Sequence, residues 1–317
     1  MRILFLGTPE FAVPALEKLI GWDDVSVVGL VTQPDRPAGR GKHVVPPPTK
    51  VLALKNNIPV LQPEKLSKAP DVVQAMADLK PDILVTVAFG QILKKNVLQM
   101  APHGVLNVHG SLLPKYRGAA PINWAIINGE TTTGVTTMFS DPGVDTGKML
   151  LKREMQIRDE MDATALADEM AVVGADLMVE TLQGLIANKL VAEAQDDTQA
   201  TMAPRLSKEM GNIDWQKSGV EIHNLVRGLS TWPGTYTFLD AAPVKILSTN
   251  VILCDPGASQ EPGTIKIEHG KFLVACGADG KDNIEICDIK PASKGKMSAV
   301  SWANGLHLKS GVRFKTQ

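Results

Sequence analysis

The first half of the chain alternates between two hydrophobic patterns. Short continuous apolar runs, such as Arg2–Gly7, are typical of strands buried on both faces of a sheet. More polar segments with apolar positions at helical spacing separate these runs. Strands that alternate with helices indicate an α/β fold with a Rossmann-like, mostly parallel sheet. We predict strands over Arg2–Gly7, Val25–Thr32, Ile58–Leu61, Asp82–Ala88 and Val105–Val108, and helices over Val51–Asn56, Asp71–Asp78 and Ala119–Asn128.

The same domain closes with two further strands and a long helix. Thr133–Phe139 and Lys148–Ile157 have the pattern of strands that could form a hairpin, and Asp162–Ile186 has that of an amphipathic helix. The segment Glu193–Arg205 is polar and has no period. We therefore predict a first domain over residues 1–189 and a linker over residues 190–208.

The pattern over residues 209–317 is different. A short helix is predicted near Val220–Leu229, and several short strands follow it. Short strands separated by Gly and Pro turns at regular spacing are typical of a small β-barrel, so we predict an OB-like barrel domain over residues 209–317. Its predicted strands are Thr235–Leu239, Val244–Leu253, Gly263–Glu268, Lys271–Cys276 and Asn283–Lys290.

Residues 33–50 interrupt the pattern of the first domain. The segment QPDRPAGRGKHVVPPPTK has five prolines, two glycines and four basic residues against one acid. We predict that it forms neither a helix nor a strand. A connection of this length inside a compact domain is usually functional, and the alternative is a disordered surface loop.

Composition narrows the class of protein. Apolar residues make up 44% of the chain and charged residues 21%, which is typical of a globular protein. No apolar run approaches the roughly 20 residues that span a bilayer, so we expect no membrane association. Cys254, Cys276 and Cys287 are odd in number and lack metal-ligand spacing. We expect no disulfide framework, no metal site and a cytoplasmic location.

Charge differs between the two halves. Residues 1–204 carry 19 basic and 23 acidic side chains, whereas residues 205–317 carry 14 and 11. After Asp288 there is no acidic residue, yet six basic residues follow: Lys290, Lys294, Lys296, Lys309, Arg313 and Lys315. This asymmetry indicates a polyanionic partner for the second half, and the alternative is a solvated basic tail.

Asn107 and His109 are the first candidates for chemistry. In open parallel sheets, ligands bind beyond the carboxyl ends of the strands, and the run Asn107-Val108-His109-Gly110 lies where a predicted strand enters a turn. Alternation along the strand places Asn107 and His109 on the same face. A single strand histidine is more often structural, but its pairing with an amide at this edge favours catalysis.

The turn Asp141–Gly147 is the second candidate. Its sequence, DPGVDTG, predicts a tight turn, in which one aspartate commonly makes local hydrogen bonds. Either Asp141 or Asp145 could have that role, which leaves the other to face His109. An Asn, a His and an Asp suffice for acyl transfer between nitrogens, because they can stabilise an oxyanion and move a proton. No Ser or Cys nucleophile is needed when the substrate supplies the amine.

Two motifs resemble the folate-dependent formyltransferase family. They are NVHGSLLPKYRGAAPI, at Asn107–Ile122, and GVDTG, at Gly143–Gly147. The resemblance implies that Asn107, His109 and Asp145 are catalytic and that 10-formyltetrahydrofolate is the formyl donor. It also implies that the folate is bound by Phe89, Gly90, Ile92, Ser111, Leu112, Leu113, Pro114 and Asp141, with the pterin held mainly by backbone over Val87–Ile92.

Within this family the resemblance is closest to the members that act on methionyl-tRNA, and it spans the whole chain. It rests on LFLGTPEFAVPAL, TQPDRPAGRGK at Thr32–Lys42, and RLSKEMGNIDW at Arg205–Trp215. It implies that the partner is initiator methionyl-tRNA, that Arg40 is wedged at the first mismatched pair of the acceptor end, and that the product is formylmethionyl-tRNA for translation initiation. We expect the protein to be a monomer. The tRNA-binding residues would be Arg36, Arg40, Lys42, Arg205, Lys208, Lys245, Lys290, Lys294 and Lys296.

Three other functions agree less well with these features of the sequence. A Rossmann oxidoreductase is disfavoured because Gly7 stands alone, without the glycine motif that binds NAD. A non-catalytic RNA-binding protein leaves Asn107, His109 and Asp145 without a purpose. A nucleotide-sugar formyltransferase would not need a basic second domain.

Overall fold

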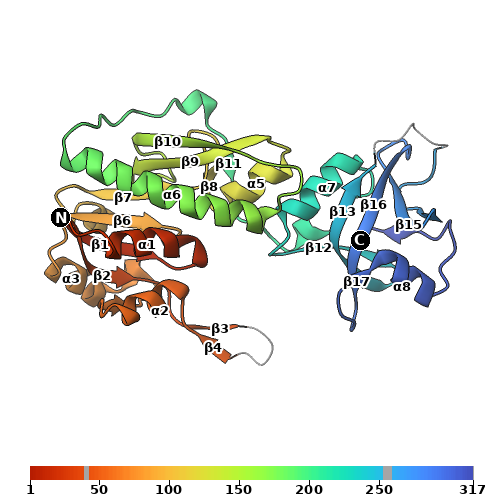
Figure 1. Ribbon diagram of the computed structural model, residues 1–317, viewed down its shortest axis with the longest axis horizontal. Helices are drawn as coiled ribbons and strands as arrows, with labels where there is room; N and C mark the ends of the chain where they lie inside the picture. Colours follow the sequence, from red (N-terminus) through yellow and green to blue (C-terminus); the bar gives the residue numbers. More distant parts are fainter. Residues whose placement is uncertain (39–42, 253–258, 317) are drawn as a thin grey trace. The chain divides into compact units, whose positions relative to one another are not determined.

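The computed structural model describes residues 1–38, 43–252 and 259–316 (Figure 1). The chain divides into two compact units, each built from more than one segment. Residues 190–204, the larger part of the predicted linker, fall in the first unit. That unit comprises Met1–Pro121, Thr132–Gln156 and Ala167–Pro204, and the second comprises Ile122–Thr131, Ile157–Leu166 and Arg205–Gln317.

A seven-stranded sheet of order β10-β9-β7-β6-β1-β2-β5 forms the centre of the first unit. The five strands from β7 to β5 are parallel, whereas β9 is antiparallel to β7 and β10 is antiparallel to β9. The predicted parallel sheet and its closing hairpin are therefore confirmed. The strands are β1 (Arg2–Gly7), β2 (Ser26–Val31), β5 (Val60–Leu61), β6 (Ile83–Val87), β7 (Val105–His109), β9 (Thr132–Phe139) and β10 (Met149–Gln156).

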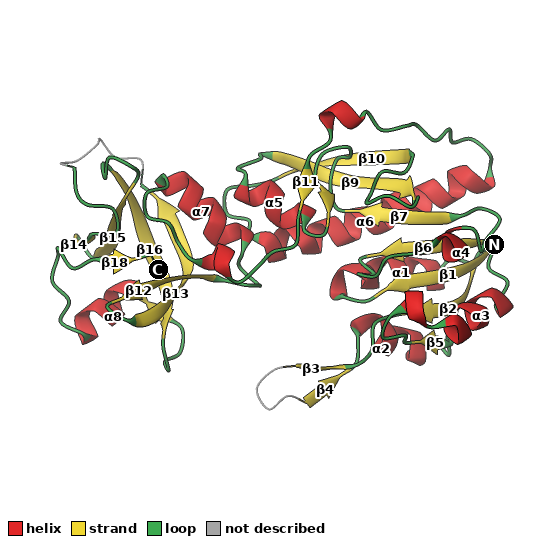
Figure 2. Ribbon diagram, turned by 180° about the vertical axis from the view of Figure 1, so that it is seen from behind, coloured by secondary structure: helices red, strands yellow, loops and turns green. Residues whose placement is uncertain are grey.

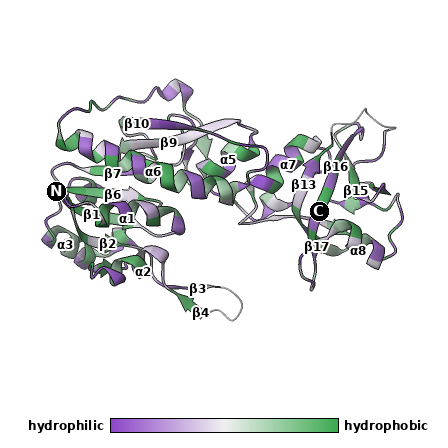
Figure 3. Ribbon diagram, in the orientation of Figure 1, coloured by the Kyte–Doolittle hydropathy of each residue, from purple (hydrophilic) through white to green (hydrophobic). Residues whose placement is uncertain are grey.

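Burial explains why the central strands are apolar throughout. Residues Ile3–Leu6 of β1 are fully buried, and every residue of β6 is buried. The edge strand β10 contains Lys152, Arg153 and Glu154, which are exposed. Figure 3 shows the resulting contrast between hydrophobic β6 and hydrophilic β10. Charged side chains on an edge strand disfavour pairing with another chain.

Helices cover both faces of this sheet. Met76 of α3 and Val97 of α4 pack against Leu4, Leu6 and Leu84. On α6, a Cβ added at Gly174 would lie 3.0 Å from Val108 Cγ1, so this helix packs closely on β7. The helices of this unit are α1 (Val13–Ile20), α2 (Pro48–Lys55), α3 (Pro70–Asp78), α4 (Lys95–Leu98) and α6 (Ala163–Ile186, of which the first four residues fall in the second unit), with 3-10 turns η1 (Glu10–Ala12) and η2 (Leu66–Lys68).

The proline-rich segment 33–50 corrects one prediction. We predicted neither helix nor strand there, but β3 (Arg36–Ala38) and β4 (His43–Val45) pair as an antiparallel ribbon. A two-stranded ribbon tolerates Pro37 because every strand in it is an edge strand. The last proline of the segment opens α2, where a missing backbone N–H costs nothing. Figure 2 shows this ribbon beside α2. Arg40 and Lys42 lie outside the described residues.

We call residues 187–204 the connector, because they lead from α6 toward Arg205. The connector is held to the first unit by backbone pairing. Glu193 and Met149 form an antiparallel bridge, and β11 (Met202–Ala203) pairs in parallel with β8 (Arg117–Gly118). A 3-10 turn, η3 (Asp197–Gln199), lies between these two attachments. A segment without hydrophobic period is thus ordered by main-chain hydrogen bonds.

The second unit is a curled antiparallel sheet of order β14-β15-β16-β13-β12-β18, in which β17 also pairs with β16. This fits the predicted OB-like fold. Its strands are β12 (Thr235–Leu239), β13 (Ala242–Val251), β14 (Ile265–Glu268), β15 (Lys271–Cys276), β16 (Asp282–Pro291), β17 (Met297–Ser298) and β18 (Phe314–Lys315). Leu253, the last residue of one predicted strand, lies outside the described residues, as does Cys254.

The core of the second unit is aromatic. Trp215 and Trp302 each stack on Phe314, and Phe272 contacts both Trp302 and Phe314. The unit also contains α5 (Pro121–Ile127) from Ile122 onward, α7 (Gly219–Gly228), α8 (Ala299–Gly305) and the 3-10 turn η4 (Glu209–Gly211). Ser218 and Glu221 form a capping box at the start of α7, which explains why that helix was predictable. The short helix α8 was not predicted.

Candidate active site

Asn107 and His109 lie on β7, near the carboxyl end of the parallel strands. Val108 packs toward α6, so the alternation of the strand turns Asn107 and His109 to the opposite face. The His109 side chain is 7% exposed. The two predicted side chains therefore share one face at the edge of the sheet where ligands bind in open α/β folds.

Thr86 fixes the orientation of the Asn107 amide. Thr86 lies opposite Asn107 on β6, and its hydroxyl donates a hydrogen bond of 2.8 Å to Asn107 Oδ1. Because the amide oxygen is taken, the amide NH2 group is the part that can meet a ligand. We did not predict a role for Thr86 from the sequence. A single hydroxyl in the apolar run of β6, one strand from Asn107, is the signal that could have identified it.

The surroundings of His109 define its tautomer. Nε2 lies 2.9 Å from the carbonyl oxygen of Tyr116, and a carbonyl can only accept, so Nε2 carries a proton. Nδ1 faces Asp145 at 3.7 Å from Oδ2. In the neutral ring Nδ1 is an acceptor, and in the charged ring it is a second donor directed at the carboxylate. Nδ1 is therefore the ring nitrogen that faces the carboxylate.

The two aspartates of the turn have different partners. Asp141 Oδ1 accepts hydrogen bonds from the Gly143 amide at 2.9 Å and from the Thr146 hydroxyl at 2.6 Å, both within the turn. Asp145 Oδ2 faces His109 and accepts a hydrogen bond of 2.9 Å from the Gly118 amide. Asp145 is thus the aspartate beside the histidine, whereas Asp141 shapes the turn.

Residues 116–118 hold the histidine and the aspartate together. The Tyr116 carbonyl binds the ring of His109, and the amide of Gly118 binds Asp145. Gly118 has φ +123, and a Cβ there would lie 2.6 Å from the carbonyl oxygen of Ala203 in the connector. Only glycine fits this position, because β8 and β11 approach so closely.

The connector also contacts the turn that carries Asp145. Gln195 Nε2 donates to the carbonyl oxygens of Asp145, at 2.7 Å, and Gly147, at 2.8 Å. Arg117 Nε donates to Gln195 Oε1 at 2.9 Å. We predicted no role for Gln195, because it lies in an aperiodic segment far from the motifs. Arg117 lies within the motif at Asn107–Ile122, but a sequence motif does not indicate which residue the side chain contacts.

The residues predicted to bind folate differ widely in exposure. Phe89, Ser111 and Leu113 are buried, whereas Ile92 is 81% exposed. The Ser111 hydroxyl donates to the Lys115 carbonyl, and Lys152 Nζ donates to the Leu113 carbonyl at 2.6 Å. The buried side chains can therefore serve a ligand only indirectly, which leaves the backbone of these segments as the binding surface. Gly90 has a φ of +77, in the left-handed region that glycine adopts readily.

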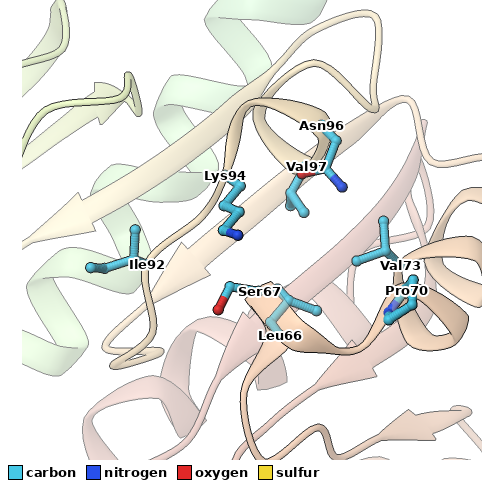
Figure 4. Close-up of a pocket in the computed structure, with 8 residues that line it drawn as sticks. All are labelled: Leu66, Ser67, Pro70, Val73, Ile92, Lys94, Asn96 and Val97. Atoms are coloured by element: carbon cyan, nitrogen blue, oxygen red, sulfur yellow. The ribbon is translucent and has the colours of Figure 1, made fainter.

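Two cavities formed by described residues of the first unit bear on the site. One of about 490 Å³ is bounded by the Asp141 turn and by Lys148, Gln195 and Asp197. The other, of about 230 Å³, lies where η2 and α3 face α4, with Ile92 at one side (Figure 4). In Figure 4 the Lys94 amine is directed toward Ser67. The larger cavity adjoins the Asp145 turn, whereas the smaller one contains no group bonded to Asn107, His109 or Asp145.

The described residues predicted to bind tRNA are all exposed, but they differ in pairing. Arg36 forms an ion pair of 2.7 Å with Glu64, and Lys296 one of 3.1 Å with Asp288. Lys245 and Lys290 are direct cross-strand partners on β13 and β16, and Tyr236 on β12 is the next partner of Lys245. The other exposed basic residues predicted to bind tRNA are Arg205, Lys208 and Lys294. We call Tyr236, Lys245 and Lys290 the basic row.

Three further observations concern metal ligands, membrane-spanning helices and a buried cysteine in the part of the chain that the structure describes. Within residues 1–38, 43–252 and 259–316, no group of three His, Cys, Asp or Glu side chains could hold a metal ion. Among the same residues no helix is long and apolar enough to cross a membrane. Burial raises the pKa of the Cys276 thiol to about 12, so this cysteine carries no thiolate near neutral pH.

Comparison with known sequences gives matches along almost the whole chain. Residues 1–182 match the model of the formyl transferase family, and residues 205–307 match that of the formyl transferase C-terminal domain. The methionyl-tRNA formyltransferase of Trichlorobacter lovleyi is 50% identical, over 98% of this chain and 96% of the relative. The methionyl-tRNA formyltransferase of Ruminiclostridium cellulolyticum is 47% identical, over 99% of both chains.

Comparison with solved structures shows the same fold at lower identity. The N-formyltransferase from Helicobacter canadensis, in complex with folinic acid and dTDP-3-aminofucose, has a TM-score of 0.67 and 22% identity, over 90% of this chain and 98% of that one. WlaRD, a sugar 3N-formyl transferase with dTDP and 5-N-formyl-THF, has a TM-score of 0.67 and 19% identity, over 93% of this chain and 99% of that one. At these identities the likeness concerns the fold alone.

Proposed function

The chain belongs to the formyl transferase family, and from this premise we propose that it transfers the formyl group of 10-formyltetrahydrofolate to the amino group of methionine on initiator methionyl-tRNA. The product, formylmethionyl-tRNA, would serve translation initiation in the cytoplasm. The observation that carries the proposal is 50% identity to a methionyl-tRNA formyltransferase over 98% of this chain. The sugar formyltransferases share the fold at only 19–22% identity.

The reaction moves an acyl group between two nitrogen atoms. The methionyl amine attacks the formyl carbon, which forms a C–N bond and a tetrahedral intermediate with a negatively charged oxygen. The bond between this carbon and N10 of the folate then breaks. The amine loses a proton and N10 gains one, so the site must stabilise an oxyanion and move a proton.

Asn107 suits the stabilisation of the oxyanion, and His109 suits the protonation of the leaving nitrogen. Thr86 turns the Asn107 NH2 group toward the ligand, and a fixed amide donor of this kind can contribute about 3 kcal/mol in the transition state. In the charged ring of His109, Nδ1–H faces the same side as Asp145, while Nε2–H stays on the Tyr116 carbonyl. Nδ1 is therefore the position that can deliver a proton to the leaving N10.

Asp145 suits the removal of the amine proton. Its carboxylate is 21% exposed, so water can reach it, and Gly118 holds Oδ2 in place. Through a water molecule the carboxylate can accept the proton that the attacking amine releases. The same charge stabilises the His109 imidazolium during the reaction. Asp145 therefore links loss of the amine proton to protonation of N10.

The folate donor would be held mainly by backbone. In the predicted segments Phe89–Ile92 and Ser111–Pro114, the side chains of Phe89, Ser111 and Leu113 are buried, which favours binding of the pterin by peptide groups. Two proteins of the same fold have been solved with a formylated folate: the N-formyltransferase from Helicobacter canadensis with folinic acid, and WlaRD with 5-N-formyl-THF. Side-chain bonds from Thr136 and Lys152 brace the second segment. Its peptide groups would thus be fixed before the ligand binds.

The basic row gives a physical reason to expect a nucleic-acid partner. Lysines directly opposite each other on neighbouring strands repel, at a cost of a few tenths of a kcal/mol or more. Lys245 and Lys290 have this arrangement on the exposed face of the second unit, beside Tyr236. A phosphate would relieve the repulsion, and an aromatic ring offers a base a stacking surface. We propose that the row binds tRNA.

A transfer assay with competing acceptors tests the proposed function. The full-length chain is incubated with 10-formyltetrahydrofolate and either methionyl initiator tRNA or a dTDP-linked amino sugar. We expect formylmethionine from the first mixture, no formylated sugar from the second, and no product with Asn107→Ala. Formylation of the sugar in place of the tRNA would overturn the proposal.

A further inference from the structure

We propose that Gln195 and Arg117 are positioning residues for formyl transfer, which act on Asp145 through the backbone of its turn. Arg117 orients the Gln195 amide, and Gln195 holds the carbonyl groups of Asp145 and Gly147. The connector is then part of the active site as well as a link between units. This inference rests on the proposed function.

The contacts of Gln195 converge on one turn. Its Nε2 group donates both of its protons, one to the carbonyl of Asp145 and one to that of Gly147. These two carbonyls flank Thr146, whose hydroxyl is bonded to Asp141. The amide therefore fixes the peptide groups at both ends of the short segment that carries the Asp145 carboxylate.

Asp145 has a backbone conformation that few residues other than glycine adopt. Its φ is +52, in the left-handed region that disfavours residues with a Cβ. Such conformations persist only when the surroundings hold them, and they cluster at functional sites. In this conformation the carboxylate accepts the Gly118 amide and lies 3.7 Å from His109 Nδ1. If the turn relaxes, the carboxylate moves away from the ring.

Arg117 determines which end of the Gln195 amide faces the turn. Its side chain is buried, and Nε donates to Gln195 Oε1. With the oxygen taken, the NH2 group must point to the two carbonyls. Nη2 of Arg117 also binds Asp197 at 2.7 Å, but the Asp197 side chain is 82% exposed, so that ion pair contributes little.

The alternative is that Gln195 only attaches the connector to the first unit. The connector has other attachments: β8 pairs with β11, and the Thr201 hydroxyl accepts a hydrogen bond of 2.9 Å from the Tyr116 amide. These bonds do not involve Gln195 and hold the connector without it. What Gln195 adds is therefore the restraint on the Asp145 turn.

Two substitutions at residue 195 separate the alternatives. Gln195→Leu removes every polar contact, whereas Gln195→Glu keeps the shape and strengthens the bond to Arg117 but cannot donate to the carbonyls. If Gln195 positions Asp145, both variants should lose about 10- to 30-fold in kcat, since two hydrogen bonds are lost, with the KM for the folate donor within about twofold. If Gln195 only attaches the connector, Gln195→Glu should keep wild-type kcat.

A double-mutant cycle tests whether the effect passes through Asp145. In an Asp145→Asn background, Gln195→Leu should cost less than about threefold, because the group that it positions is already lost. Gln199→Leu is the matched control, since Gln199 lies in the same segment and, within the part of the chain that the structure describes, its side chain bonds to Asp196 and not to the Asp145 turn. Its kcat should equal that of the wild type. Thermal unfolding of each variant verifies that it folds.

The outcomes separate failure of this inference from failure of the proposed function. If the wild-type chain does not formylate methionyl-tRNA, the proposed function fails before any variant is compared. If the wild type is active and Gln195→Glu is equally active, or if the Gln195 and Asp145 effects multiply, the positioning role is overturned. If Gln195→Leu fails to fold, Gln195→Glu and the cycle of Arg117→Lys with Asp145→Asn give the same test.

Discussion

The candidate active site and the basic row use polar residues in opposite ways. At the site, the polar side chains are largely buried and held by neighbours: Thr86 holds Asn107, and Tyr116 and Gly118 hold His109 and Asp145. In the row, Lys245 and Lys290 are exposed and repel each other. Hydrogen-bond donors that are held in place stabilise the charge that develops in a transition state, whereas exposed cations bind any polyanion. The two regions should therefore differ in which kinetic constant they control.

The largest effect should come from the residues that touch the reacting atoms. His109→Ala and Asn107→Ala should each lower kcat by about 100-fold or more, because each removes stabilisation of the transition state. Steady-state kinetics with both substrates varied measures this, and circular dichroism verifies the fold. Normal turnover by folded Asn107→Ala would remove the oxyanion role.

The two aspartates should differ in a second comparison. Asp145→Asn should cost about as much kcat as His109→Ala, because it removes the charge beside His109 Nδ1. Asp141→Asn should cost less, because its contacts lie within the turn. Turnover of the two variants is measured under identical conditions. Greater harm from Asp141→Asn would mean that we assigned the wrong aspartate.

Thr86→Val should have an intermediate effect. Valine keeps the shape of the side chain but leaves Asn107 Oδ1 without its donor, which should lower kcat by about 10-fold for the loss of one hydrogen bond. Thr86→Ser, the matched control, keeps the hydroxyl and should retain most of the activity. Equal turnover by both variants would show that the amide does not depend on Thr86.

The smallest effects should come from the basic row. Lys245→Ala and Lys290→Ala should leave kcat unchanged and weaken the binding of every tRNA. Each should reduce the slope of log Kd against log salt concentration by roughly one unit. Lys296→Ala should weaken binding less, because Asp288 already neutralises part of that charge. Titrations at two salt concentrations decide this, and a loss confined to initiator tRNA would refute the simple phosphate contact.

Helices and strands could be predicted from the sequence wherever the hydrophobic period and the turn residues indicated the same element. The apolar runs of β1 and β6 indicate strands buried on both faces. The capping box formed by Ser218 and Glu221 indicates the start of α7. The motifs around His109 identified the family, which is confirmed. The β3–β4 ribbon was missed because its proline content disfavours central strands and does not exclude edge pairing.

The supporting residues of the site were not predictable in the same way. Thr86 and Gln195 act through partners 21 and 50 residues away, at Asn107 and Asp145. No local period or motif records such a contact. Arg40 and Lys42 remain predictions, since they lie outside the described residues. Sequence patterns therefore pointed to the candidate groups, whose catalytic role stays a prediction, and the structure was needed to find what holds them.

Single-turnover transfer, with the enzyme in saturating excess over methionyl-tRNA, tests the division between the two regions most directly. Asn107→Ala and Lys290→Ala are compared with the wild type, with excess enzyme and 10-formyltetrahydrofolate. We predict that the rate falls by about 100-fold for Asn107→Ala and stays unchanged for Lys290→Ala, because saturation removes only the binding defect. A wild-type rate with Asn107→Ala, or an equal loss in both variants, would contradict the assignment of chemistry to one region and binding to the other.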